Sequence, residues 1–195
     1  MHQTTEIIVA ATGASGVPYT IRLLELLTEV PSVSLVHFLA TDIASIIAKD
    51  ESGKSWDEII GSLKNNSKII PYENNDFSAP FASGNSSVDA MVIVPCSMKT
   101  LAALASGFSS NLILRAADVI VKESKKLIIV PRETPLHLIH LKNMLLLKKT
   151  GAVILPAMPA FYFKPHSIAD IIDFIVAKIL LQLNISHPII QLWKK

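Results

Sequence analysis

The residues with the clearest chemical potential lie in the stretch 91–100, M-V-I-V-P-C-S-M-K-T. The apolar, β-branched run from Val88 to Val94 lacks polar alternation, which is typical of a strand buried on both faces of a parallel sheet. The run breaks at a proline, and a helix is predicted from Met98 to Ala105. Ligands of open α/β sheets bind at the carboxyl ends of strands. The hydroxyls of Ser97 and Thr100 and the N–H groups of the new helix are therefore candidate ligand contacts.

A second junction of this kind follows a strand predicted at Glu6–Ala11. The turn T-G-A-S-G at 12–16 precedes a helix predicted at Val17–Val30. Its glycines let the backbone turn and approach a ligand, and the helix N-terminus supplies donors to an anion. The turn has neither the G-x-G-x-x-G of dinucleotide sites nor the Gly-Lys-Ser/Thr of a Walker loop. It fits a single phosphate better than a pyrophosphate, or it is only a strand–helix turn that needs glycine.

Basic side chains on a later helix form a second candidate anion site. Arg115 and Lys122 lie on one face of a helix predicted at Asn111–Glu123, with Asp118 three residues after Arg115. The row is either a set of surface ion pairs or two cations aimed at a phosphate. On the next helix, His137 and His140 stand at i and i+3, but no acidic residue or third ligand completes a zinc pattern. We therefore predict no metal site.

Other polar residues have simple structural explanations beside functional ones. Thr41, which follows a strand predicted at Val33–Ala40, is either an N-cap or a ligand contact. Glu51 is interpreted as a solvated charge. The stretch 73–87 is long for a loop in a compact domain, and such loops are usually functional or disordered. Its segment 82–85 (A-S-G-N) is a candidate cover for a bound ligand.

The elements that must position these residues alternate as strand and helix about five times along the chain. This alternation predicts an α/β fold with a doubly wound, mostly parallel sheet, Rossmann-like or flavodoxin-like, in three layers and a single domain. The domain is expected at 1–183, followed by a tail at 184–195. The remaining predicted strands are Leu127–Val130 and Ala152–Leu155, and the remaining predicted helices are Asp42–Lys49, Ser55–Leu63, Leu136–Thr150 and Ile168–Leu183.

Composition excludes several classes of protein. The chain has 195 residues, of which 50% are hydrophobic and 17% charged, so it suits one ordered domain with a substantial core. A net charge of +2 is too small to indicate a nucleic-acid partner. The single cysteine, Cys96, excludes an intrachain disulfide and predicts a cytoplasmic protein. Charges and prolines interrupt the most apolar segments, so we predict no membrane span. The high hydrophobicity instead suggests buried contacts between subunits.

A set of short motifs, in order along nearly the whole chain, resembles the UbiX-type flavin prenyltransferases, in the wider family of homo-oligomeric flavin-containing cysteine decarboxylases. Each motif is weak by itself, and the set is specific. The motifs are T-G-A-S-G at 12–16, A-S-G at 82–84, P-C-S-M-K-T-L at 95–101, R-A-A-D-V-I-V-K-E at 115–123, R-E-T-P-L at 132–136 and G-A-V-I-L-P-A-M-P-A-F-Y at 151–162.

The resemblance implies a role for each matching residue. FMN would be held by Gly13, Ala14, Ser15, Thr41, Ser97, Met98, Lys99, Thr100 and Arg132. The phosphate of dimethylallyl phosphate would be held by Arg115, Lys122, Tyr162 and Lys178, with Trp193 closing the site. Ser15 and Glu133 would assist proton movement. Lys178 stands where relatives often carry arginine, which keeps the charge but loses the bidentate fork. Without a ligand role, Tyr162 would be a packed aromatic, Trp193 a tail anchor and Cys96 a buried thiol.

The implied reaction transfers a dimethylallyl group from dimethylallyl phosphate to N5 and C6 of reduced FMN. The product, prenylated FMN, would serve a UbiD-type decarboxylase. Because the reduced flavin supplies the nucleophile, the protein must mainly stabilise the departing phosphate, which cations can do without a metal. The family also implies a dodecamer built from trimers, with active sites at subunit interfaces.

Two other functions remain open at this stage. A flavin-dependent decarboxylase of a peptidyl or pantothenoyl cysteine has the same architecture but uses a histidine near the flavin, and Val17–Val30 contains none. A flavin carrier would have no need for the extra cations or for Glu133.

Overall fold

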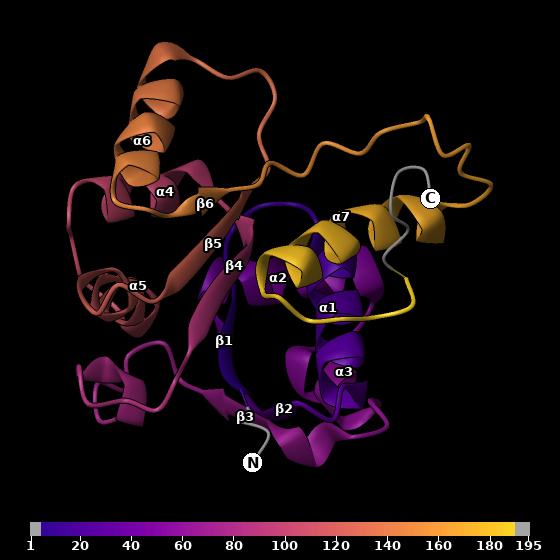
Figure 1. The fold of residues 1–195 in the computed structure, drawn as a ribbon, viewed down its shortest axis with the longest axis horizontal. Coiled ribbons are helices and arrows are strands. Elements are labelled where there is room, and N and C mark those ends of the chain that lie inside the picture. Colours follow the sequence, from indigo (N-terminus) through magenta and orange to yellow (C-terminus); the bar gives the residue numbers. More distant parts are fainter. Residues whose placement is uncertain (1–4, 190–195) are drawn as a thin grey trace.

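Six parallel strands form the centre of the structure, a computed structural model that describes residues 5–189 (Figure 1). The strands are β1 (Thr5–Ala11), β2 (Val33–Ala40), β3 (Ile69–Tyr72), β4 (Ala90–Cys96), β5 (Lys126–Pro131) and β6 (Val153–Ile154). They are arranged in the order β3-β2-β1-β4-β5-β6, and every pairing is parallel. The strand order reverses between β1 and β4, so their carboxyl ends form the switch point at which such sheets bind ligands.

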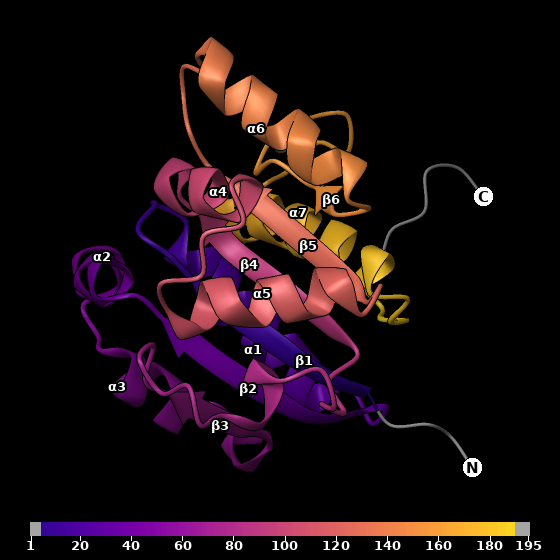
Figure 2. The same ribbon diagram turned by 90° about the vertical axis from the view of Figure 1, so that its left-hand side faces the viewer.

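Helices cover both faces of the sheet (Figures 1 and 2). One face packs against α1 (Val17–Glu29), α2 (Asp42–Ser52), α3 (Trp56–Gly61) and α7 (Ile168–Gln182). The other face packs against α4 (Met98–Ala105), α5 (Leu112–Lys122) and α6 (Leu138–Lys149). Short 3₁₀ turns at Asn66–Lys68 and Pro80–Ala82 complete the order of elements.

Alternation along the central strands explains the two cores. In β1, Ile7 and Val9 face the core that contains α1 and α7, whereas Ile8 and Ala10 face the core that contains α5. Successive strand side chains point to opposite faces of a sheet. Because both faces are covered, both sets are apolar, which accounts for the continuous apolar runs in the sequence.

The predicted fold class is confirmed, and its local boundaries mostly hold. The bounds of β2 and α4 are those predicted from the sequence. The run from Val88 to Val94 was predicted as a strand that ends before Pro95. This end was wrong, because the corresponding strand, β4, continues to Cys96 across a register shift after Ile93. Strand β3 was not predicted. It has four residues and contains Pro71, which a strand at the edge of a sheet tolerates.

Two further expectations concern the chain as a whole. Within residues 5–189, none of the helices combines the length and the hydrophobicity that crossing a bilayer requires. The division into a domain at 1–183 and a tail at 184–195 stays a prediction, because residues 190–195 lie outside the described part.

A buried histidine lies in the middle of β2. His37 is 2% exposed, its Nδ1 lies 3.2 Å from the hydroxyl of Tyr72, and its ring centroid lies 5.0 Å from that of Phe81. Desolvation by burial lowers the pKa of His37, and Glu6 offsets this only partly. The Glu6 carboxylate is 3.5 Å from Nε2, which is too long for a strong hydrogen bond. His37 is therefore neutral in the folded chain at pH 7.

We predict that this histidine makes the fold sensitive to acid. The unfolded chain takes up a proton near pH 6.5, whereas the folded chain resists protonation, so stability falls as the pH drops below about 6.5. One proton contributes at most about 1.4 kcal/mol per pH unit. Unfolding free energy measured in urea between pH 7.5 and 5 should fall less steeply for His37→Phe than for the native chain or for a control at an exposed histidine, His166→Gln. Equal slopes for all three proteins would contradict this.

Candidate functional site

A single buried hydroxyl joins the two loops at the switch point. Thr12, which follows β1, is 1% exposed. Its Oγ1 donates to the Pro95 carbonyl at 2.9 Å and accepts from the Ser97 N–H at 2.8 Å. The Thr12 N–H donates to the same Pro95 carbonyl at 3.1 Å. The turn after β1 and the loop after β4 are therefore held together at the place where an open α/β sheet binds its ligand.

The two glycines of this turn are required for different reasons. A Cβ on Gly13 would lie 2.8 Å from Cγ2 of Ile43 in α2, so the turn packs directly against that helix. Gly16 has φ +125°, a conformation that side chains strongly disfavour. Together they bring the backbone of Ala14 and Ser15 to the edge of the sheet.

A carboxylate from α2 closes the N-terminus of α1. Glu51 accepts from the Gly16 N–H at 3.2 and 3.1 Å and from the Val17 N–H at 2.8 Å. An anion at this position satisfies free N–H groups and interacts favourably with the helix dipole. Glu51 is exposed, as expected of a solvated charge, and it also has a capping role that the sequence did not indicate. Its carboxylate also occupies N–H groups that the sequence analysis assigned to a phosphate.

A third loop, after β5, reaches the same place. The Arg132 N–H donates to the Cys96 carbonyl at 3.3 Å, and Arg132 Nε donates to the Ser15 carbonyl at 3.2 Å. The next residue, Glu133, accepts from the Thr134 N–H at 3.0 Å. A hollow of about 60 Å³ lies beside this loop, lined by Pro131, Arg132, Glu133, Thr134, Leu136, Met144, Pro156, Ala157 and Met158. It is much smaller than the roughly 300–1,000 Å³ of an ordinary small-molecule site. This hollow by itself is too small for a molecule as large as a flavin.

The remaining residues expected to contact FMN are helix caps or lie beside one. Thr41 Oγ1 accepts from the Ala44 N–H at 3.1 Å, so Thr41 is the N-cap of α2. Ser97 is the N-cap of α4, accepting from the Thr100 N–H at 3.3 Å and donating to Thr100 Oγ1 at 3.1 Å. Met98 is buried and Lys99 is exposed. All four loops lie at the carboxyl edge of the sheet, as predicted, and the ligand roles of these residues stay predictions.

The basic row on α5 carries intrachain partners. Arg115 Nη1 lies 3.0 Å from Asp118 Oδ2, and Lys122 Nζ lies 3.6 Å from Glu123 Oε1. Arg115 Nε also donates to the Ala82 carbonyl at 2.9 Å. The A-S-G motif lies against this helix so closely that a Cβ on Gly84 would stand 2.5 Å from Glu123 Oε1 and 3.2 Å from Lys122 Nζ. The structure thus joins two of the sequence motifs, A-S-G at 82–84 and the motif at 115–123, and it shows the ion pairs of the basic row.

The other two expected phosphate ligands lie across the sheet. Lys178 Nζ is 5.5 Å from the ring centroid of Phe174, and the ring of Tyr162 meets the same ring edge-on at 6.0 Å. Helix α7, which carries Lys178, packs on the face opposite α5 (Figure 1). The predicted phosphate ligands are therefore divided into two pairs within one chain. Trp193 lies outside the described residues.

The two histidines near the start of α6 and the single cysteine have structural surroundings in the part of the chain that is described. Among residues 5–189, no group of three or more His, Cys, Asp and Glu side chains is arranged to hold a metal ion. His137 is the N-cap of α6, where its Nδ1 accepts from the N–H groups of Ile139 and His140. Cys96 is fully buried, and burial raises the pKa of its thiol far above the usual range. Its sulfur is therefore a thiol and not a nucleophilic thiolate.

Comparison with known proteins gives full-length matches. The family described as Flavoprotein matches residues 1–180. The "Flavin prenyltransferase UbiX" of Methanocaldococcus jannaschii is 47% identical over 96% of this chain and 98% of its own length. A crystal structure of a dodecameric FMN-dependent Ubix-like decarboxylase from Escherichia coli O157:H7 has a TM-score of 0.91 and 38% identity, over 98% of this chain and all of that chain. The structure of AnUbiX (PadA1) in complex with FMN and dimethylallyl pyrophosphate has a TM-score of 0.91 and 39% identity, over 98% of both chains.

We predict that removing the bridging hydroxyl loosens the switch point. Thr12→Val leaves the half-buried Ser97 N–H without its acceptor, which typically costs about 1–3 kcal/mol. The unfolding free energy should fall by that amount, and hydrogen exchange at the Ser97 amide should accelerate. Thr28→Val is the matched control, because Thr28 is equally buried but donates only to the Glu25 carbonyl of its own helix. If the two variants behave alike, the bridge has no special role.

Proposed function

The chain belongs to the UbiX-type flavin prenyltransferases, within the flavoprotein family, and from that premise we propose how its residues bind FMN and dimethylallyl phosphate and join them. The reaction transfers a dimethylallyl group to N5 and C6 of reduced FMN and releases phosphate. Prenylated FMN then serves a UbiD-type decarboxylase. The observation that carries the proposal is the convergence of the turn after β1 and the loops after β4 and β5 at one edge of the sheet.

FMN is held at this edge. The turn at Gly13, Ala14 and Ser15 offers close backbone approach, and Thr41, Ser97 and Thr100 offer hydroxyls. Arg132 and Lys99 add exposed positive charge, and Met98 contributes only its backbone because its side chain is buried. This donor set suits an anionic phosphate together with the carbonyl and nitrogen atoms of a flavin ring. Reduced FMN supplies the nucleophile, N5.

Ser15 and Glu133 carry the proton movement in this proposal. The Ser15 backbone is fixed by Arg132, and Glu133 follows Arg132 at the rim of the hollow. Bonding at N5 would displace phosphate and release the N5 proton, and ring closure would place one proton on the alkene and remove one from C6. The Glu133 carboxylate or the released phosphate would therefore accept one proton overall. Glu51 supports the arrangement from the other side, because its hydrogen bonds to Gly16 and Val17 hold the end of the turn.

The phosphate site is built from two copies of the chain. On α5, the charges of Arg115 and Lys122 are balanced by Asp118 and Glu123, so this row alone offers no net charge to a dianion. Stabilising a departing phosphate requires additional positive charge. Lys178, together with Tyr162, supplies it from a second copy, since within one chain these residues lie on the opposite face of the sheet. Trp193 closes the site.

The surface of α6 supports assembly of copies. Leu138, Ile139 and Leu145 are 63%, 63% and 55% exposed, and Leu141 and Leu146 on the same helix are exposed as well. Large apolar side chains exposed together on one surface are typical of a protein–protein contact. We propose that it is covered in a homo-oligomer, a dodecamer like that of the relative from Escherichia coli O157:H7. We place this assembly in the cytoplasm, where a free thiol such as that of Cys96 persists.

The experiment that tests the function is incubation of the protein with chemically reduced FMN and dimethylallyl phosphate in the presence of a chelator. We expect the flavin mass to increase by one dimethylallyl group in the native protein. In Glu133→Gln, we expect unchanged FMN affinity and product formation slowed about 10²–10⁴-fold, the usual contribution of a general base.

Glu29→Gln, at the exposed C-terminal end of α1, makes the same change of charge away from the site and should react at the native rate. A flavin of unchanged mass in the native protein would contradict the function. A Glu133→Gln variant with the native single-turnover rate would remove only Glu133 from the mechanism and leave phosphate as the base.

A further inference from the structure

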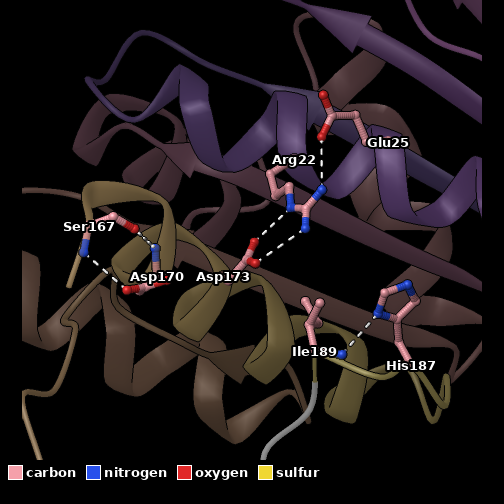
Figure 3. A network of polar contacts seen from close by, with 7 residues as sticks. All are labelled: Arg22, Glu25, Ser167, Asp170, Asp173, His187 and Ile189. Carbon is pink, nitrogen blue, oxygen red and sulfur yellow. Dashed lines mark hydrogen bonds and ion pairs between the residues drawn. The ribbon is translucent and has the colours of Figure 1, made fainter. Parts of the chain in front are cut away.

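One turn of α7 is fixed to α1 by a two-pronged ion pair (Figure 3). Arg22 Nε donates to Asp173 Oδ1 at 2.6 Å, and Arg22 Nη2 donates to Asp173 Oδ2 at 3.2 Å. Arg22 Nη1 also contacts Glu25 at 3.2 Å, within α1. A guanidinium that bonds both oxygens of a carboxylate fixes orientation as well as distance. The rotation of α7 relative to α1 is therefore determined at Asp173.

The next residue on this turn, Phe174, gathers two of the groups assigned to the phosphate site. Its ring is stacked on Phe163 with centroids 5.2 Å apart and planes 3° apart. The ring of Tyr162 meets it edge-on at 6.0 Å, and Lys178 Nζ lies 5.5 Å from its centroid. One half-buried ring thus joins the loop after β6 to a lysine one turn further along α7.

Such a ring restricts the side chains that contact it. Lys178 and Tyr162 are both exposed, and a lysine side chain loses considerable rotamer entropy when it is held in one place. A ring at i−4 lies directly beside Lys178 on the helix surface and attracts its ammonium group. The edge-to-face contact similarly limits the orientations of Tyr162. The ring therefore lowers the entropy that Lys178 loses when a substrate binds, and it adds to the contacts that orient Tyr162.

We propose that Phe174 is a positioning residue of the prenyl-phosphate site, which holds the Lys178 ammonium and the Tyr162 ring together, and that the Arg22–Asp173 pair fixes the turn that carries it. This inference rests on the proposed roles of Lys178 and Tyr162. In the copy that supplies Lys178, it also links that site to α1, the helix that follows the proposed FMN-binding turn at 12–16 (the flavin turn). Phe174 itself has no chemical step to perform.

The test separates the aromatic face from the volume of the side chain. Phe174→Leu keeps an apolar side chain and removes the ring, whereas Phe174→Tyr keeps the ring. We expect Phe174→Leu to lower kcat/KM for dimethylallyl phosphate about two- to thirtyfold and to weaken binding of inorganic phosphate, measured by calorimetry, by a similar factor. FMN affinity should not change, and Phe174→Tyr should restore both values. Phe108→Leu, at an exposed phenylalanine outside this cluster, is the matched control.

A double-mutant cycle shows whether the ring acts through the lysine. Lys178→Ala should cost less in the Phe174→Leu background than in the native chain, because the ammonium is already misplaced there. Additive effects would overturn the inference, as would native kinetics in Phe174→Leu or equal losses in the leucine and tyrosine variants.

Asp173→Asn tests the anchor without touching the ring, and it applies even if Phe174→Leu does not assemble. It should lower kcat/KM for dimethylallyl phosphate at constant FMN affinity, and native kinetics would overturn the role of the pair. Failure of the proposed phosphate role of Lys178 can be distinguished from failure of the inference about Phe174. If Lys178→Ala is harmless in a protein that makes prenylated FMN, the phosphate role of Lys178 is wrong. If Lys178→Ala lowers kcat/KM for dimethylallyl phosphate and Phe174→Leu does not, only the role of Phe174 is wrong.

Discussion

The organisation of the site depends on the hydroxyl of Thr12. Neighbouring parallel strands bring their carboxyl ends to one edge of a sheet, but the ladder between β1 and β4 stops before the loops begin. Thr12 continues the connection by donating to Pro95 and accepting from Ser97. Arg132 then adds the loop after β5 through its contacts with Cys96 and the turn after β1. A site for a planar cofactor needs this kind of fixed edge, because loops that move independently would lose affinity through ordering costs.

Patterns among neighbouring residues predicted much of the fold. Features that depend on contacts between distant parts of the chain were not predicted. Apolar runs and helix caps are properties of a few adjacent residues, so the bounds of β2 and α4 followed directly from the sequence. Strand β3 was not predicted, because four residues that include a proline give too short a pattern to indicate a strand. The capping role of Glu51 at the N-terminus of α1 was not predicted for a different reason. Its partner Gly16 is 35 residues away, and only the packing of α2 beside the flavin turn brings the two together.

The proposed phosphate site shows the same difference between what the sequence predicts and what only the fold determines. The family resemblance implies that one phosphate is held by Arg115, Lys122, Tyr162 and Lys178. The fold separates them by the thickness of the sheet, with α5 on one face and α7 on the other (Figures 1 and 2). No pattern within one chain specifies which copy supplies which cation. The balanced charges on α5 are the physical reason for our proposal that a second copy contributes Lys178.

The most direct test of this account is a subunit-mixing experiment with Lys122→Ala and Lys178→Ala. Each variant alone should lose about ten- to a hundredfold in the use of dimethylallyl phosphate, the cost of one charge-assisted contact. The two are then co-expressed with different tags and purified through both. If each site takes Lys122 from one copy and Lys178 from another, about a quarter of the sites in a random mixture carry both lysines, and activity returns to about that fraction of the native value. A mixed oligomer no more active than its parents would show that both lysines of a site belong to one chain, and would contradict the account.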